Sequence, residues 1–140
     1  METEGRLAPE TAAAARAAFD SLGPVAQTVV RETAKAMAFD ADEYDRRVTG
    51  EVVATAREAL FAAMLEVRVG SREEFDDWRD GFDGEMTVLG SDNVERVAWH
   101  AVPFADAAVA TTFHEKREAA VGTLRRQAFG RHYREVVCDG

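Results

Sequence analysis

The chain has 140 residues and a formal net charge of −9, with 17 Lys and Arg residues against 26 Asp and Glu. This length suits one domain over residues 1–140, and a hydrophobic content of 46% is too high for a disordered acidic tail. No apolar run approaches the roughly 18 residues that a membrane span needs, and the opening METEGRLAPE lacks an apolar signal segment. We therefore expect a cytoplasmic protein that does not enter a membrane.

The composition also indicates the kind of genome and the salt concentration of the cytoplasm. Only Lys35 and Lys116 are lysine, isoleucine is absent, and Asn93 is the one asparagine, as is typical of a GC-rich genome. Excess acid suits a cytoplasm at molar salt, where a Debye length of about 3 Å screens self-repulsion. The alternative is an acidic protein of a GC-rich bacterium living at ordinary salt. The single cysteine, Cys138, excludes an internal disulfide and a cysteine-based zinc site.

The first 65 residues predict helices. Residues 12–22 carry one apolar edge, and Gly23 followed by Pro24 ends this helix and begins a second one. The second helix has an apolar face at helical spacing, formed by Val25, Val29, Val30, Thr33 and Met37. Asp40 resembles the start of a capping box for a short helical turn. Thr49 can cap a third long helix, whose apolar face runs through Val52, Val53, Ala56, Leu60, Ala63 and Met64.

Strand patterns follow these helices. Residues 66–69 alternate like a short strand, and Ser71 with Glu74 forms a capping box for the next helix. Residues 86–89, 94–102 and 107–113 suit three further strands. Strands grouped after helices predict an α+β fold. We expect an N-terminal layer of three helices (residues 1–65), a small, mostly antiparallel sheet of three to four strands (66–114) and a long C-terminal helix (115–137).

Three histidines, His100, His114 and His132, raise the question of a metal site. If residues 103–106 form a hairpin loop, Val102 faces Ala107, and His100 lies opposite Val109. His100 and His114 then lie on opposite faces of the sheet and cannot converge. The chain also lacks a GxSxG serine elbow and a phosphate-binding glycine pattern. We therefore predict no metal, no other cofactor and no specific catalytic residue.

The C-terminal helix reverses the charge of the chain. Residues 114–134 hold six basic and two acidic residues, a net +4. On a helical projection Arg126, Arg131 and Arg134 fall outside the apolar arc, which makes them a candidate interaction surface.

A polar line, Glu118–Arg125–His132, falls instead on the apolar side of this helix. A buried guanidinium requires a partner, so Arg125 is either a structural residue that ties the helix to the sheet or part of a ligand site. In the second interpretation His100, Glu118, Arg125 and His132 line a small cleft for an anionic ligand. Replacing Arg125 by Leu separates the two, since only a structural residue is required for folding.

Residues 130–134 also mix basic and aromatic residues, as nucleic-acid-binding surfaces do. Stacking on bases requires an exposed aromatic side chain, and only Tyr133 could supply one. Molar salt would weaken phosphate contacts steeply. The pattern therefore favours a protein partner, or a second copy of the chain, over nucleic acid.

Three segments resemble a known family: ETAAAARAAFDSLGPVAQTVVRETAKAM, then NVERVAWH followed by Pro103-Phe104, then AAVGTLRRQAFGRHYREV from Ala119. From about residue 7 to residue 137 the chain is similar to a haloarchaeal family that is classed only as a domain of unknown function. The resemblance implies a halophilic archaeal cytoplasm and assigns no activity, cofactor or catalytic residue.

Two hypotheses follow for function. The first is a non-catalytic binding or interaction protein that uses the exposed arginines of the last helix to bind another protein or a second copy of itself. The alternative is a small enzyme or anionic-ligand-binding protein with a polar cleft around His100, Arg125 and His132. A concave pocket that joins these three side chains would favour the alternative.

Overall fold

The N-terminal helices begin at capping residues. The computed structural model describes residues 1–91 and 93–138. Helix α1 (Ala12–Ser21) is capped by the hydroxyl of Thr11, and α2 (Gly23–Ala36) has Pro24 in its first turn. The side chains of Asp40 and Thr49 cap α3 (Ala41–Arg47) and α4 (Gly50–Met64), as predicted. The predicted short turn is thus a seven-residue helix, so four helices rather than three precede the strand at residue 67 in the described chain.

The strands form one mixed sheet. It contains β1 (Glu2–Glu4), β2 (Val67–Ser71), β3 (Glu85–Leu89), β4 (Arg96–Val102) and β5 (Ala107–Phe113) in the order β1-β2-β4-β5-β3. The described residues therefore give five strands where three to four were expected, and β3 pairs parallel to β5. The other three pairings are antiparallel. The predicted hairpin register is confirmed, because Val102 pairs with Ala107 and His100 with Val109.

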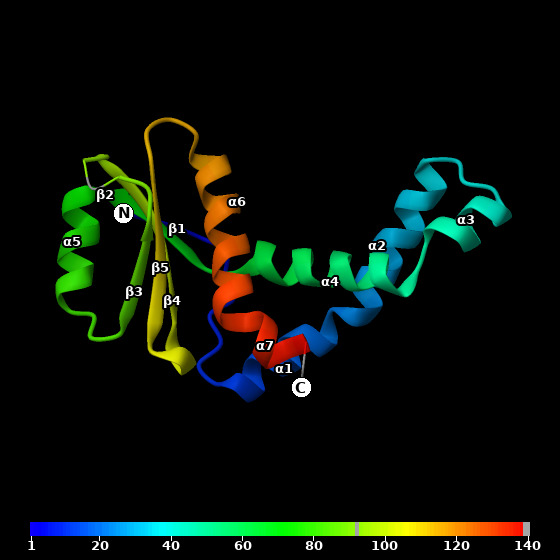
Figure 1. Ribbon diagram of the computed structural model, residues 1–140, viewed down its shortest axis with the longest axis horizontal. Helices are drawn as coiled ribbons and strands as arrows, with labels where there is room; N and C mark the ends of the chain where they lie inside the picture. Colours follow the sequence, from blue (N-terminus) through cyan, green and yellow to red (C-terminus); the bar gives the residue numbers. More distant parts are fainter. Residues whose placement is uncertain (92, 139–140) are drawn as a thin grey trace.

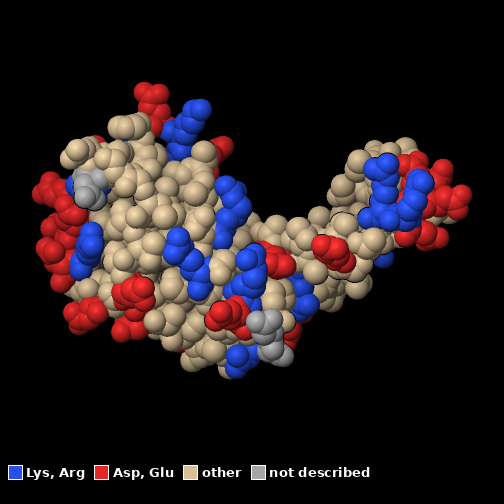
Figure 2. Space-filling model, viewed as in Figure 1, with Lys and Arg blue, Asp and Glu red and all other residues tan. Residues whose placement is uncertain are grey.

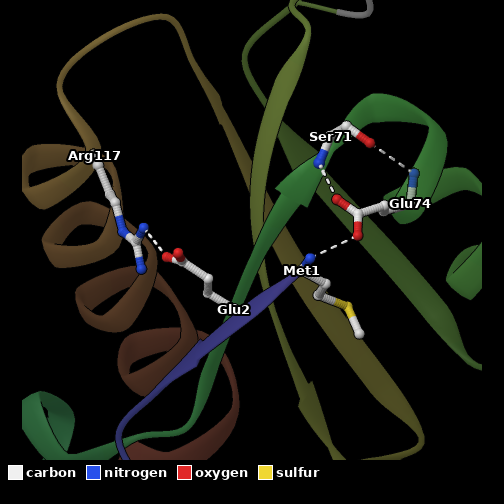
Figure 3. Close-up of polar contacts among 5 residues, drawn as sticks. All are labelled: Met1, Glu2, Ser71, Glu74 and Arg117. Atoms are coloured by element: carbon white, nitrogen blue, oxygen red, sulfur yellow. Dashed lines mark hydrogen bonds and ion pairs between the residues drawn. The ribbon is translucent and has the colours of Figure 1, made fainter.

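Strand β1 was not predicted, and side-chain contacts hold it at the sheet edge. Arg117 binds the carboxylates of Glu2 and Glu4. Figure 3 shows its contact with Glu2, together with the amino group of Met1, which lies 2.7 Å from Oε2 of Glu74. Glu74 also accepts the backbone N–H of Ser71 and so completes the predicted capping box of α5 (Arg72–Asp80). These hydrogen bonds lower the pKa values of Glu2 and Glu74.

Helices cover both faces of the sheet. Helix α5 packs on one face, where Phe75 and Trp78 contact Trp99 of β4. Helices α1 and α6 (Arg117–Ala128) lie on the other face with α7 (Arg134–Cys138), over the larger core (Figure 1). The two core clusters lie on opposite faces of the sheet. Successive side chains of a strand alternate between the faces, so Trp99 and His100 of β4 point in opposite directions.

The C-terminal helix is continuous but changes its winding. Residues Phe129–Tyr133 form a π-helical segment between α6 and α7. The wider turn directs both Phe129 and Tyr133 into the core, with exposed fractions of 3% and 0%. Both rings pack edge-on against Phe61, the fully buried residue near the end of α4.

Helices α2 and α3 and the first part of α4 do not cover the sheet. They extend away from the sheet and its covering helices as a hairpin, which we call the arm (residues 23–60) (Figure 1). Only the last turns of α4 enter the core, through Phe61, Ala62 and the following Leu65. The expected N-terminal helical layer is therefore wrong for these helices, because their apolar faces do not meet the sheet.

Candidate functional site

His100 is buried and has a partner on each ring nitrogen. Nδ1 lies 2.5 Å from the carbonyl oxygen of Glu66, and Nε2 lies 2.7 Å from the hydroxyl of Tyr133. A carbonyl can only accept, so Nδ1 carries the proton, and Nε2 accepts the hydroxyl proton of Tyr133. Burial is the largest cause that lowers the pKa of His100 to about 4, and burial raises the pKa of Tyr133. Both groups are thus neutral at pH 7.

Arg125 reaches the neighbouring carbonyl. Its Nε and Nη2 atoms donate to the carbonyl oxygen of Leu65 over 3.1 and 2.9 Å. Leu65 and Glu66 form the connection between α4 and β2. Arg125 and His100 therefore hold two consecutive carbonyl groups of this connection, one from α6 and one from β4.

The other two residues of the predicted cleft differ in position. His132 is half-buried, and its Nε2 has no hydrogen-bond partner among the described residues. Burial lowers the pKa of His132, and His132 and Arg125 both act on the charge of His100 from nearby. Glu118 is exposed, about 10 Å along the helix from Arg125. The structure thus gathers His100, Arg125 and His132 and leaves Glu118 apart, while the hollows described below are lined by other residues.

The position of Tyr133 differs from the one expected when residues 130–134 were considered as a nucleic-acid-binding surface. It was expected at the edge of the apolar arc, as the one aromatic available for stacking on a base. Instead its side chain is fully buried between Phe61, Phe104 and His100. The π-helical turn rotates it inward, so it offers no stacking surface.

Arg126, Arg131 and Arg134 are exposed, as their helical positions predicted. Arg126 and Arg134 line a hollow of about 470 Å³ where the arm meets α6. We call this hollow the arginine notch; its other lining residues are Thr55, Glu58, Ala59, Ala62 and Phe129. In it, Nε of Arg134 lies 3.2 Å from Glu58, and the guanidinium lies over the ring of Phe129. Figure 2 shows basic side chains over these helices beside the start of the arm.

The arm exposes apolar side chains that the sequence placed on buried faces. Val25, Val29, Met37 and Val52 retain 45%, 41%, 60% and 42% of their accessible surface. At the outer end, α2 and α4 enclose a second hollow of about 410 Å³, which we call the tip hollow. Its lining is mostly apolar: Val29, Val30, Thr33, Ala34, Met37, Phe39, Arg47, Val48, Val52 and Ala56.

The tip hollow and the arginine notch lie along one side of α4. A third hollow, of about 240 Å³, lies between them and is lined by Thr49, Glu51, Val52 and Thr55. It shares Val52 with the tip hollow and Thr55 with the notch. The three hollows therefore form one trough along α4, apolar at its outer end and basic at its inner end.

Sequence reasoning found the arginines of this surface but missed the arm. The signal was present in the periodic apolar positions of residues 25–37 and 52–64. That pattern shows that one face of a helix is apolar, and it does not show which surface covers that face.

Two further observations concern membranes and metal ions. None of the helices described is both long and apolar enough to cross a membrane. Within residues 1–91 and 93–138, no three side chains of His, Cys, Asp or Glu are grouped so as to hold a metal ion.

Of the comparisons with known proteins, one gives a match, to a family model. No curated protein matches the chain, and no solved structure matches it. A family model matches residues 6–134, which is nearly the whole chain. The chain belongs to the family described as a family of unknown function, DUF5809.

Proposed function

We propose that the protein is a non-catalytic protein-interaction module whose arm is the contact surface. The observation that carries this proposal is the exposure of Val25, Val29, Met37 and Val52 on helices that project from the core. Complete burial of such a side chain contributes about 1.5–3 kcal/mol. Because these four retain 41–60% of their accessible surface, a substantial part of that stabilisation is still available to a partner. Large exposed apolar patches on soluble proteins mark surfaces that bind other proteins.

The arm contributes little to the core that it leaves. The larger core closes around α1, α6 and the end of α4, and the chief apolar residues of α2 and the start of α4 lie outside it. A helix hairpin that needed only to connect α1 to β2 would carry polar residues on its outer faces. The apolar outer face of the arm is therefore better explained by a partner than by folding.

The alternative function is an anionic-ligand site or small enzyme around His100, Arg125 and His132. It is favoured by one observation, the buried Nε2 of His132 that lacks a partner in the described part of the chain. His100 and Arg125 are already occupied by backbone carbonyls and Tyr133, so a ligand would have to displace these contacts. We therefore place this function second, and we keep a haloarchaeal cytoplasm as the proposed setting.

A photo-crosslinking experiment tests the arm. A benzophenone amino acid replaces Met37 on the arm or, as control, the exposed Asp76 on α5, in cells that produce the protein. We expect a discrete crosslinked species from position 37, absent from position 76 and lost when Val29→Asp is added. Equal crosslinking from both positions, or none from either, would contradict the proposal.

A further inference from the structure

We propose that the partner of the arm is a second copy of this chain. Two arms would lie antiparallel along their α4 troughs, so that the acidic outer end of each arm lies beside the arginine notch of the other. This inference rests on the proposed function and adds the identity of the partner.

The dimensions of α4 allow this arrangement. Its 15 residues span about 22 Å, and the trough follows almost its whole length. A two-fold axis across the middle of α4 places the first turn of one copy against the last turns of the other. Val52 and Thr55 then face the region of Ala59 and Ala62, where small side chains let two helices approach closely. Such a contact is self-complementary, as the interface of a two-fold dimer must be.

The charges of the two ends are complementary. Residues 40–47 hold four acidic residues (Asp40, Asp42, Glu43, Asp45) and two basic ones, a net −2. Asp40, Asp42 and Asp45 are exposed. Figure 2 shows acidic side chains at the outer end of the arm, beside basic ones. Arg47 is directed back into the arm, where it lies 3.9 Å from Glu43 and over the ring of Phe39.

At the other end of α4, Arg126 and Arg134 line the notch, and Arg131 is exposed one turn away. Two copies that each carry −9 repel one another, so a contact between them needs attraction of this local kind.

Other occupants fit the trough less well. An anionic lipid surface or a nucleic acid would be attracted to the arginine notch but repelled by the exposed acidic residues of α3 at the outer end of the arm. A second copy presents a basic group to the acidic end and an acidic group to the basic end at once. The observations therefore favour a second copy over these classes.

Sedimentation of the purified chain tests the inference. We expect a species of twice the 15.4 kDa chain mass over 1–200 µM protein, in about 0.15 M NaCl and in about 2 M NaCl. An end-reversed variant, Asp42→Lys with Asp45→Lys, should raise the dimer dissociation constant by about tenfold or more in 0.15 M NaCl. A notch-reversed variant, Arg126→Glu with Arg134→Glu, should do the same. Both effects should shrink in 2 M NaCl, where the Debye length falls to about 2–3 Å.

Combining the changes makes the experiment decisive. The chain with all four substitutions restores opposite charges across the interface, so its dissociation constant should return to within about threefold of the original. The matched control, Asp76→Lys with Asp77→Lys on α5, has the same charge change as the end-reversed variant and should dimerise normally. Circular dichroism identifies a variant that fails to fold, and recovery in the fourfold variant cannot come from misfolding.

Two results would overturn the inference: a monomer at 200 µM in both salts, or a dimer that neither charge reversal weakens. A monomeric chain that still crosslinks to a different protein from position 37 would refute the second copy and leave the interaction module standing. A chain that dimerises while position 37 crosslinks no better than position 76 would refute the module itself.

Discussion

The hydroxyl of Tyr133 donates to Nε2 of His100 over 2.7 Å and joins the π-helical turn of the C-terminal helix to the middle of β4. The other ring nitrogen of His100 donates to the carbonyl of Glu66, so the imidazole is fixed in one neutral tautomer. This buried contact links three parts of the chain that are distant in sequence, which makes it a sensitive point for stability.

The first prediction concerns pH. Burial lowers the pKa of His100 from 6.5 in the unfolded chain to about 4. Between these values the unfolded state binds the proton and the folded state does not, so stability falls as the pH falls from about 6.5 to 4. The loss is on the order of 3 kcal/mol in the free energy of unfolding, measured by urea titration at several pH values.

His100→Asn is the control for this pH dependence. Its amide can still donate toward Glu66, but it does not titrate. The variant should be less stable at pH 7 and should show a flatter profile between pH 4 and 6.5 than the original chain. Parallel profiles for the two proteins would show that another group causes the loss.

The second prediction is that Tyr133→Phe lowers the free energy of unfolding by about 1–3 kcal/mol, because it leaves Nε2 of His100 buried without a donor. Thermal and urea unfolding measure the loss. Tyr44→Phe on α3 removes the other tyrosine hydroxyl of the chain from a half-buried position and should change stability by less than about 0.5 kcal/mol. Equal losses in both variants would refute the special role of the His100 contact.

Much of the fold was predictable because its signals are local. Asp40, Thr49 and Ser71 cap helices as their side chains indicated, and the four-residue loop after Val102 set the register of β4 and β5. Strand β1 was missed because its residues, Glu2–Glu4, are polar and show no alternation. The parallel pairing of β3 depends on the path of the chain around α5, which no local pattern records.

The candidate surfaces also divide into features that local sequence patterns predicted and features that they did not. A helical projection predicted the exposure of Arg126, Arg131 and Arg134, and all three are exposed although only Arg126 precedes the π-helical turn. It misplaced Tyr133, because the π-helical turn shifts the angle of the residues within it. The arm was not predicted, because an apolar face such as that of Val25 and Val29 gives no information on what covers it.

The third prediction tests Arg125. Replacing it by Leu removes two hydrogen bonds to the carbonyl of Leu65 and should cost about 1.5–3 kcal/mol of unfolding free energy. Arg126→Leu is the matched control at the next residue, since Arg126 is exposed and bonds only to Thr123 of its own helix among the contacts described. It should change stability by less than about 0.5 kcal/mol. Unchanged stability in Arg125→Leu would favour a ligand-binding role for this residue instead.

The fourth prediction concerns Gly5, which lies against the same carbonyl of Leu65. Gly5 has φ of +77°, in the region that favours glycine. A Cβ atom there would lie 2.5 Å from the carbonyl oxygen of Leu65 and 2.7 Å from Nη2 of Arg125. Gly5→Ala should therefore lower the free energy of unfolding by about 1–3 kcal/mol, or more if the Arg125 contact is broken.

Gly50→Ala separates this local clash from a general effect of replacing glycine. A Cβ atom at Gly50, the first residue of α4, meets nothing within 4 Å, and its φ is not positive. Alanine there should leave stability unchanged or raise it by up to about 1 kcal/mol, because it restricts the unfolded chain and favours the helix. In the double variant Gly5→Ala with Arg125→Leu, the combined loss should be smaller than the sum of the two single losses, since each change disturbs one shared contact. Strictly additive losses would show that Gly5 and Arg125 support the Leu65 carbonyl independently.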